Sequence, residues 1–272
     1  MDKRRRIKFI LLIAVSVFAV LFIAAIVIFV TGIYSSKVSE VLSLQKLYPN
    51  TFQTVDVYVD FGNIQVLPSY DTNVHLTIYS DSLYNVDTSD NTLSITSSEK
   101  GEIPFLKTKS LVQIYLPDMA YQKVSLVSNC GDVSIDQFTQ TGFEIDGTLG
   151  DVTVTQARSL SVFTDFGDLK IGDVGNLSVE KKLGDTEATN VTEKVSIDKS
   201  FGDISIENLS LIDNSAINLS FGNLDITSIS NASVDASSKW GDVSVEGVGE
   251  NEAVQFPYQL TIKNKFGSIR VA

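Results

Sequence analysis

The sequence has very few of the residues that most active sites require. Its 272 residues include one cysteine, Cys130, and one histidine, His75. A single thiol excludes an internal disulfide, and so small a set excludes a zinc site made of His and Cys ligands. His75 lies in an alternating run, so we expect it on the outer face of a strand. A Ser-His-Asp site around His75 is excluded, and no phosphate-binding loop occurs in the sequence. We therefore predict no catalytic, cofactor-binding or metal-binding residues.

Basic residues are scarce after the first 30 positions. Those positions hold five basic side chains against one acid, whereas the rest of the chain carries 16 basic and 32 acidic ones. The early basic residues are Lys3, Arg4, Arg5, Arg6 and Lys8. A surface with so large a negative excess repels polyanions, so nucleic-acid binding is excluded.

One long apolar run stands near the start. Phe9 to Val30 is interrupted only by Ser16 and would span roughly 33 Å as a helix, enough for a bilayer core. A cleaved signal peptide has a shorter apolar region and a small-x-small site, which Thr31 to Tyr34 match poorly. We therefore predict an uncleaved signal anchor: residues 1–8 form a cytoplasmic basic tail, residues 9–33 one transmembrane α-helix, and the chain beyond lies outside the cell.

Residues 34–50 are predicted to be a stalk. Apolar residues recur at helical spacing from Ser35 to Tyr48, just before Pro49. We expect a short helix that extends the membrane helix, with a partner-binding amphipathic helix as the alternative.

The remainder, residues 51–272, is organised around a repeated unit. An anchor residue is followed by Gly, usually Asp, and then apolar residues spaced by one. The anchors are Phe61, Cys130, Leu149, Phe166, Leu183, Phe201, Phe221, Trp240 and Phe266. From Cys130 onward their spacings are 19, 17, 17, 18, 20, 19 and 26 residues. A fixed period of this kind indicates one structural unit stacked many times.

Numbered from the anchor at zero, apolar residues recur at −6, −4, +3, +5 and +8, as with Val195, Ile197, Ile204, Ile206 and Leu209 around Phe201. The phase slips at the Gly-Asp pair, which predicts a corner where Gly takes a positive φ and Asp caps the turn. The number of residues per unit varies only in the segment between position +8 of one unit and position −6 of the next. This favours an all-β fold, a parallel β-solenoid (a single-stranded β-helix with about 18 residues per coil), over an antiparallel meander. We expect residues 51–122 to form an amino-terminal cap with the first strands and residues 123–272 the regular coils.

Two columns of side chains follow from the stacking. The first consists of Asp132, Asp151, Asp168, Asp185, Asp203 and Asp242. Asn63, Asn223 and Ser268 replace Asp in three units, which suits a turn former better than a calcium ligand, so we predict corner caps and keep calcium as the alternative.

The second column is aromatic and consists of Phe166, Phe201, Phe221, Trp240 and Phe266. It shares a strand face with apolar residues, so we expect a core stack and keep a sugar-binding platform as the alternative. Cys130 occupies an anchor position and is expected to be a buried small hydrophobe.

The chain stops just after the corner at Phe266. We therefore expect an open terminal coil, whose Lys263, Lys265 and Arg270 discourage edge-to-edge pairing. A docking edge for a partner or a second copy is the alternative.

The run Ile114-Tyr115-Leu116-Pro117, then Val124 to Leu126, then Asn129-Cys130-Gly131-Asp132-Val133 resembles the bacterial "putative adhesin" β-strand-repeat family of unknown function (DUF4097-like). The resemblance covers roughly residues 50–272. It implies a β-solenoid outside the cell, often on a single span in Gram-positive bacteria, and it supplies no catalytic residues.

We expect a membrane-anchored, extracellular, non-enzymatic and adhesin-like module that binds a cell-envelope component or another extracellular ligand. The alternative is an accessory or sensor protein of an envelope-stress signalling system, with a membrane signalling protein as its partner. A glycan-acting enzyme would need a carboxylate pair, and none stands out among the acidic residues.

Overall fold

The computed structural model describes residues 38–97, 109–246 and 256–272. The predicted tail (1–8) and transmembrane helix (9–33) lie outside these ranges. Within the described ranges, no helix is long and apolar enough to cross a membrane.

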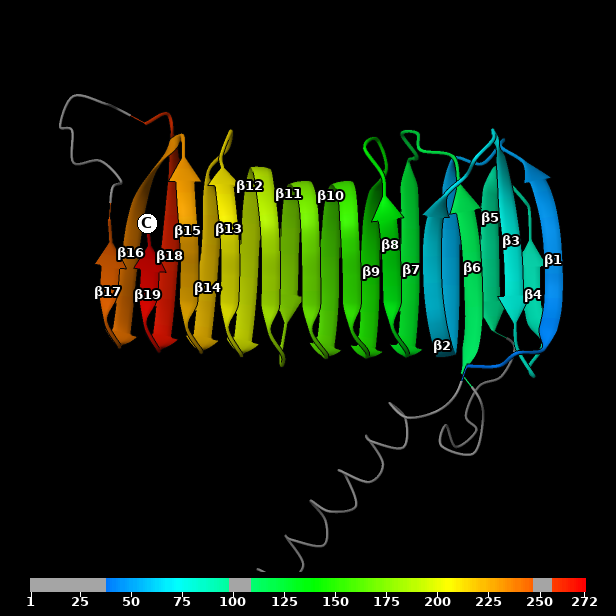
Figure 1. Cartoon of the computed structure of the whole chain (residues 1–272), viewed down its shortest axis with the longest axis horizontal. Helices are drawn as coiled ribbons and strands as arrows, with labels where there is room; N and C mark the ends of the chain where they lie inside the picture. Colours follow the sequence, from blue (N-terminus) through cyan, green and yellow to red (C-terminus); the bar gives the residue numbers. More distant parts are fainter. Residues whose placement is uncertain (1–37, 98–108, 247–255) are drawn as a thin grey trace, which may run out of the picture.

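The protein is all-β in the part of the chain that the structure describes. Its strands stand side by side along the long axis, with β1 at one end and β17 at the other (Figure 1). Near the amino-terminal end lie β1 (Leu42–Pro49), β2 (Thr54–Pro68), β3 (Asn73–Tyr79), β4 (Tyr84–Asp87), β5 (Thr92–Ser97) and β6 (Ser110–Leu116). The middle holds β7 (Lys123–Cys130), β8 (Val133–Gln137), β9 (Gly142–Leu149), β10 (Val152–Phe166), β11 (Leu169–Lys181), β12 (Thr186–Phe201), β13 (Ile204–Ser210), β14 (Ser215–Phe221) and β15 (Leu224–Ser230). The last four are β16 (Ala232–Trp240), β17 (Val243–Val245), β18 (Tyr258–Phe266) and β19 (Ile269–Val271).

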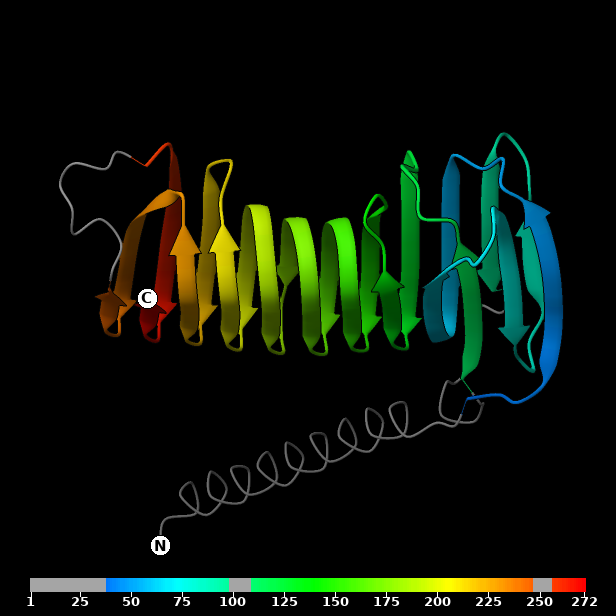
Figure 2. The same ribbon diagram turned by 45° about the horizontal axis from the view of Figure 1, so that its top comes forward.

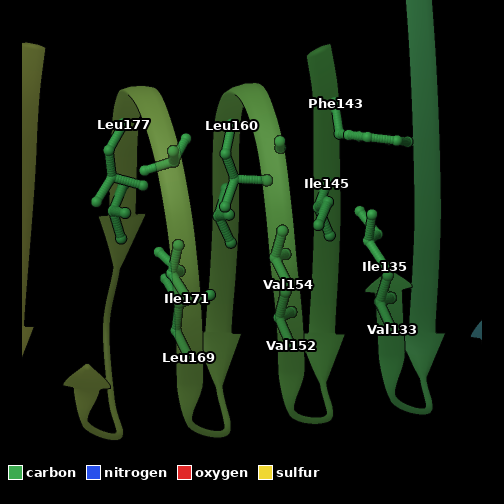
Figure 3. Packing of buried hydrophobic residues seen from close by; sticks show 14 of the residues in the cluster. Val133, Ile135, Phe143, Ile145, Val152, Val154, Leu160, Leu169, Ile171 and Leu177 are labelled. Atoms are coloured by element: carbon green, nitrogen blue, oxygen red, sulfur yellow. The ribbon is translucent and has the colours of Figure 1, made fainter. Parts of the chain in front are cut away.

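Each repeated unit makes one flattened coil with two walls (Figure 2). We call the strand segments that run into the Gly corners the first wall and those that leave the corners the second wall. Side chains of both walls fill the space between them, as Leu160 and Leu177 of the first wall and Val154 and Ile171 of the second wall show (Figure 3). The apolar positions predicted on either side of the corner are buried: around Phe201 they are 0–2% exposed.

Equivalent positions of neighbouring coils lie side by side and run parallel. Leu160 pairs with Leu177 between β10 and β11, and Phe201 pairs with Phe221 between β12 and β14. The parallel pairing of successive units was therefore predicted correctly, because only a parallel register brings each corner beside the next one. The full stack is more complicated than a simple solenoid, since the spatial order of the coils departs from the sequence order at both ends and antiparallel strands extend the amino-terminal end.

At the carboxyl-terminal end, spatial order and sequence order differ. The coil formed by β18 and β19 lies between that of β14 and β15 and that of β16 and β17. The predicted open edge at the last corner is therefore wrong, because β18 is paired on both sides. Leu260 pairs with Ser215 on one side and with Val234 on the other. The longest spacing between anchors, 26 residues from Trp240 to Phe266, falls between these two units.

The amino-terminal end is also out of order. Strand β2 lies between the coil of β5 and β6 and the coil of β7 and β8, all parallel to it. Beyond β6, the strands β3 and then β1 continue the second wall in antiparallel pairing, and β4 pairs antiparallel with β5. Antiparallel strands thus extend this end of the stack.

The helical stalk predicted for residues 35–48 is wrong over its described part. Leu42–Pro49 form β1, which pairs with β3 from Leu42 opposite Tyr79 to Pro49 opposite Asn73. Backbone hydrogen bonds to an existing strand decide the conformation of so short a segment, whose helical spacing is only a weak preference.

Candidate functional site

The Gly corners lie along one edge of the stack (at the bottom in Figure 1) and organise the chemistry of the molecule. At Gly202 the φ angle is +105°, and a Cβ atom there would lie 2.3 Å from the carbonyl oxygen of Gly184 in the neighbouring coil. The predicted need for glycine therefore has two causes, the left-handed backbone and the close approach of two corners.

Apart from Asp242, whose side chain makes no such bond among the described residues, the Asp column caps the corners, but across coils rather than within one. The Oδ1 atom of Asp185 accepts a hydrogen bond of 2.8 Å from the backbone N–H of Asp203, and Oδ1 of Asp203 accepts one of 2.7 Å from Asn223. The same bond, 2.8–3.0 Å long, joins the corresponding residues from Asn63 through Asp132, Asp151 and Asp168 to Asp185, and from Asn223 to Ser268. This accounts for Asn in the column, because an amide oxygen accepts equally well.

Within the described ranges, no cluster of three or more His, Cys, Asp or Glu side chains is arranged to hold a metal ion. The calcium alternative therefore has no support in the arrangement of the described residues.

A polar column lies inside the coil directly beneath the corners, at position −2. Lys199 donates from Nζ to the carbonyl oxygen of Asp203, and Lys181 does so to that of Asp185 at 2.8 Å. In other coils the donors are the hydroxyls of Ser128 and Ser238 and the amide of Asn264. The corner directs backbone carbonyls inward, where each requires a donor. Sequence reasoning missed this column, although polar residues recurring two before the anchor are its visible signal.

Lys181 and Lys199 are almost completely buried, at 2% and 0% exposure. Burial lowers the pKa of each ammonium group to about 8, because the charged form loses hydration. The carboxylates of Asp168 and Asp185 at the corners oppose that decrease.

The aromatic column is on the surface, which contradicts the expected core stack. Phe166, Phe201, Phe221 and Phe266 are 41–46% exposed, and Trp240 is 63% exposed. The chain turns away from the interior as it enters the corner, so the last inward position is −2 and the anchor points outward.

The rings stack on one another along the corner edge. Phe201 and Phe221 have centroids 4.8 Å apart and planes 5° apart, and Phe221 and Phe266 have values of 4.7 Å and 3°. Such stacking stabilises neighbouring coils by about 0.5–1.5 kcal/mol per pair. It also turns the ring edges, not the ring faces, toward solvent. A sugar-binding platform along the column is therefore disfavoured, because sugars pack on ring faces.

A groove on the outer side of the first wall gathers three lysines. Lys239 of β16 and Lys263 and Lys265 of β18 line it, together with Ser220 and Asp198. All three lysines are exposed. None has a carboxylate within ion-pair distance among the described residues. We call this the lysine groove. Arg270, which the sequence grouped with Lys263 and Lys265, lies on β19 in the second wall instead.

The single cysteine and the single histidine of the chain both lie outside the lysine groove. Cys130 is a free thiol that is half-buried, not fully buried as expected; burial and nearby Asp60 raise its pKa, which favours the protonated form. His75 lies on the outer face of β3, as expected, with Nε2 3.0 Å from Oδ1 of Asp71. The backbone N–H of Asn73 and the imidazole hold the pKa of the Asp71 carboxyl well below its usual range.

The geometry defines an all-β protein built from stacked coils in the part of the chain that the structure describes. Residues 52–268 match the family described as Toastrack DUF4097, and the chain belongs to that family. The family resemblance found in the sequence is thereby confirmed.

Similar solved structures include two named "putative adhesin" and one named "putative lipid binding protein". The adhesin from Bacteroides fragilis is 16% identical, with 86% of this chain and 98% of that chain covered and a TM-score of 0.39. The second, from Parabacteroides distasonis, is 14% identical, with 87% and 100% covered and a TM-score of 0.33. The structure named "putative lipid binding protein", from the same species, is 8% identical, with 88% and 100% covered and a TM-score of 0.38. TM-scores this low support no inference about function. None of the curated proteins compared with the chain matches it.

Proposed function

We propose that the protein is a non-enzymatic, adhesin-like surface module that binds an anionic polymer of the cell envelope or of the cell's surroundings. The lysine groove is the observation that carries this proposal. Three exposed ammonium groups lie together there without carboxylate partners among the described residues, in a chain of net charge −12. Unpaired like charges that are held together attract a multivalent counterion.

The excess of acidic residues elsewhere does not prevent such binding. Charges farther away than about 8–10 Å are largely screened at physiological ionic strength. A single polymer strand can lie along the groove within that distance, whereas a nucleic-acid duplex would also meet the acidic faces. The outer first wall beside the groove carries short polar side chains such as Asn218, Ser220 and Ser237, which can hydrogen-bond sugar or phosphate oxygens.

We further propose that residues 9–33 anchor the module in the cell membrane, with the amino terminus in the cytoplasm and residues after about 33 outside. The apolar run from Phe9 to Val30 and the preceding basic residues support this orientation. Protease added to intact cells should digest the carboxyl-terminal domain. Complete protection, with digestion after lysis, would contradict the proposed location without affecting the groove.

Binding should be measured with the full chain in detergent, titrated with a uronate polysaccharide and with a glycerol-phosphate polymer, and with dextran as the neutral control. The pair of changes Lys263→Ser and Lys265→Ser should weaken binding at least about tenfold, because two of the three charges are lost. The matched control is Lys170→Ser, an exposed lysine on the second wall, which should leave binding unchanged.

Two outcomes would contradict the proposal. One is equal binding of dextran and the anionic polymers, and the other is an equal loss in the Lys170→Ser control. Shortening of either polymer during incubation would show that the module is an enzyme.

A further inference from the structure

The carboxyl-terminal end of the stack is uncovered in a way that the inner coils are not. At positions +3 and +5 of inner coils, Ile204 and Ile206 are 1% and 0% exposed, whereas the equivalent Val243 and Val245 of β17 are 42% and 39% exposed. Trp240 beside them is the most exposed anchor. Among the described residues, β16 pairs only with β18 and β17 only with β19. The outer backbone groups of both strands are therefore unpaired within the described part of the chain.

An unpaired edge with apolar side chains can receive another strand. The side-chain pattern of β16 indicates which strand fits. Its outward residues are Ser233, Asp235, Ser237 and Lys239, and the alternate residues Val234 and Ala236 pack toward the core. Asp235 and Lys239 are equally distant from Ser237 on the same face, and they carry opposite charges.

We infer that this end binds a second copy of the same chain, β16 against β16 in antiparallel pairing, about a two-fold axis at Ser237. In that arrangement Asp235 lies opposite Lys239 of the second copy, and the same pair forms again by symmetry. Residues directly opposite each other in an antiparallel pair have their Cβ atoms about 4.5–5.5 Å apart, within reach of an ion pair. At the inward-facing positions next to the axis, Ala236 lies opposite Ser238 of the second copy.

The second wall fits the same symmetry. An axis that crosses both walls at the end of the stack also brings β17 against β17 of the second copy. The uncovered Val243 and Val245 of the two chains then cover one another. A two-fold contact is self-complementary and closes after two copies, so it gives a dimer rather than a fibre. The interface is only as large as the cross-section of one coil. Because this contact area is small, we expect a dissociation constant on the order of micromolar.

The inference does not rest on polymer binding or on the membrane anchor, although it pairs Lys239 of the lysine groove with Asp235 of the second copy and leaves Lys263 and Lys265 for a polymer. Self-association is measured without polymer, so the two proposals can fail separately. The inference is tested by charge reversal in the full chain, followed by analytical ultracentrifugation. Asp235→Lys places Lys opposite Lys, and Lys239→Asp places Asp opposite Asp, so each variant alone should self-associate at least about tenfold more weakly than the original chain. The double variant restores both pairs and should dimerise as the original chain does.

Mixing the two single variants gives the sharpest result. One copy then offers two lysines and the other two aspartates in the antiparallel register, so a mixed dimer should form although neither variant dimerises alone. Asp146→Lys is the matched control, since it reverses an exposed charge on β9 in the middle of the first wall. It should leave association unchanged.

A cysteine at the axis gives an independent measurement. With Cys130→Ser, a Ser237→Cys change should yield a disulfide-linked dimer under mild oxidation, because the residue meets its own copy. Ser196→Cys, on the outer side of β12, should not. The inference is overturned if the original chain stays monomeric at about 1 mM. It is also overturned if the mixed variants fail to associate, or if the Ser196→Cys variant cross-links as well as the Ser237→Cys variant.

Discussion

At the scale of single residues, each corner has two adjacent positions with different requirements. The Gly position tolerates no side chain, whereas the Asp position needs only an oxygen atom that accepts a hydrogen bond. Gly202 is held by its positive φ and by the carbonyl of Gly184. Asp203 contributes one oxygen to the N–H of Asn223. The two neighbours therefore differ sharply in what a substitution removes.

Gly202→Val should lower the free energy of unfolding by about 3 kcal/mol or more, through backbone strain and the clash with the neighbouring corner. Asp203→Asn should cost under about 0.5 kcal/mol, because the amide oxygen still accepts the bond. Urea unfolding of both variants provides the comparison. Equal losses would contradict the corner geometry.

The burial of Lys181 and Lys199 predicts that the free energy of unfolding increases with pH in the alkaline range. The pKa of Lys181 and of Lys199 is about 8 in the folded protein, below the ordinary value of 10.5. Between these values the unfolded chain holds more protons than the folded one. The free energy of unfolding should therefore rise as pH increases through 8, by at most about 1.4 kcal/mol per pH unit and lysine.

Urea unfolding at pH 7 and at about pH 9.5 measures this rise. The range ends there because burial raises the pKa of Tyr121 to about 12, which reverses the trend once tyrosines ionise in the unfolded chain. Lys199→Met should remove about half of the rise. A slope that is the same with and without Lys199 would show that these lysines are not its source.

At the scale of elements, the order of the coils decides which residues matter. Ile269 and Val243 occupy the same position of the unit, but β19 is covered on both sides and β17 on one side. Ile269 is 1% exposed and Val243 is 42% exposed. A stack in sequence order would have placed Ile269 at the end.

Ile269→Ala should therefore cost about 2–5 kcal/mol, as expected of a buried isoleucine, and Val243→Ala less than about 1 kcal/mol. Ile204→Ala in the middle of the stack serves as the reference for a fully covered coil. Thermal or urea unfolding distinguishes the two orders. A larger loss for Val243→Ala than for Ile269→Ala would refute the inserted position of β18 and β19.

At the scale of the whole molecule, stacking places like charges in columns. The carboxylates of Asp132, Asp151, Asp168, Asp185 and Asp203 recur at each coil, about 4.8 Å apart. Each also caps the next coil, so the column combines favourable hydrogen bonds with repulsion of roughly 1 kcal/mol per neighbouring pair in a water-like medium. Added salt screens only the second of these effects.

The melting temperature should therefore rise by several degrees between low salt and about 0.5 M sodium chloride. Changing Asp151, Asp168 and Asp185 together to Asn keeps the caps and removes the charges; the comparison is made at about pH 9.5, where Lys181 and Lys199, whose charged form these carboxylates favour, are mostly neutral. The triple change should raise the melting temperature at low salt and flatten its dependence on salt. A melting temperature that falls with salt, or the same dependence in both proteins, would exclude column repulsion as a major factor.

The local pattern of the sequence was enough to predict the strands, the corners and the inward apolar positions. Period-two alternation and the Gly-Asp phase slip act within one coil, so they can be read without knowing its neighbours. The column of Asp caps followed from the same pattern, although its bonds join different coils. The helix predicted for residues 35–48 failed because a partner strand, β3, lies far away in the sequence.

Only the tertiary structure decided the order of the coils, the direction of the anchor side chains and the burial of Lys181 and Lys199. Units with the same pattern present interchangeable edges, so nothing local distinguishes β18 from β16 as the neighbour of β14. The anchors point outward because the corner turns the backbone between −2 and zero. The lysines lie inside because corner carbonyls, directed inward by that same turn, require donors there. The lysine groove and the uncovered end depend on that order, which places Lys239 of β16 beside Lys265 of β18 and leaves β16 outermost.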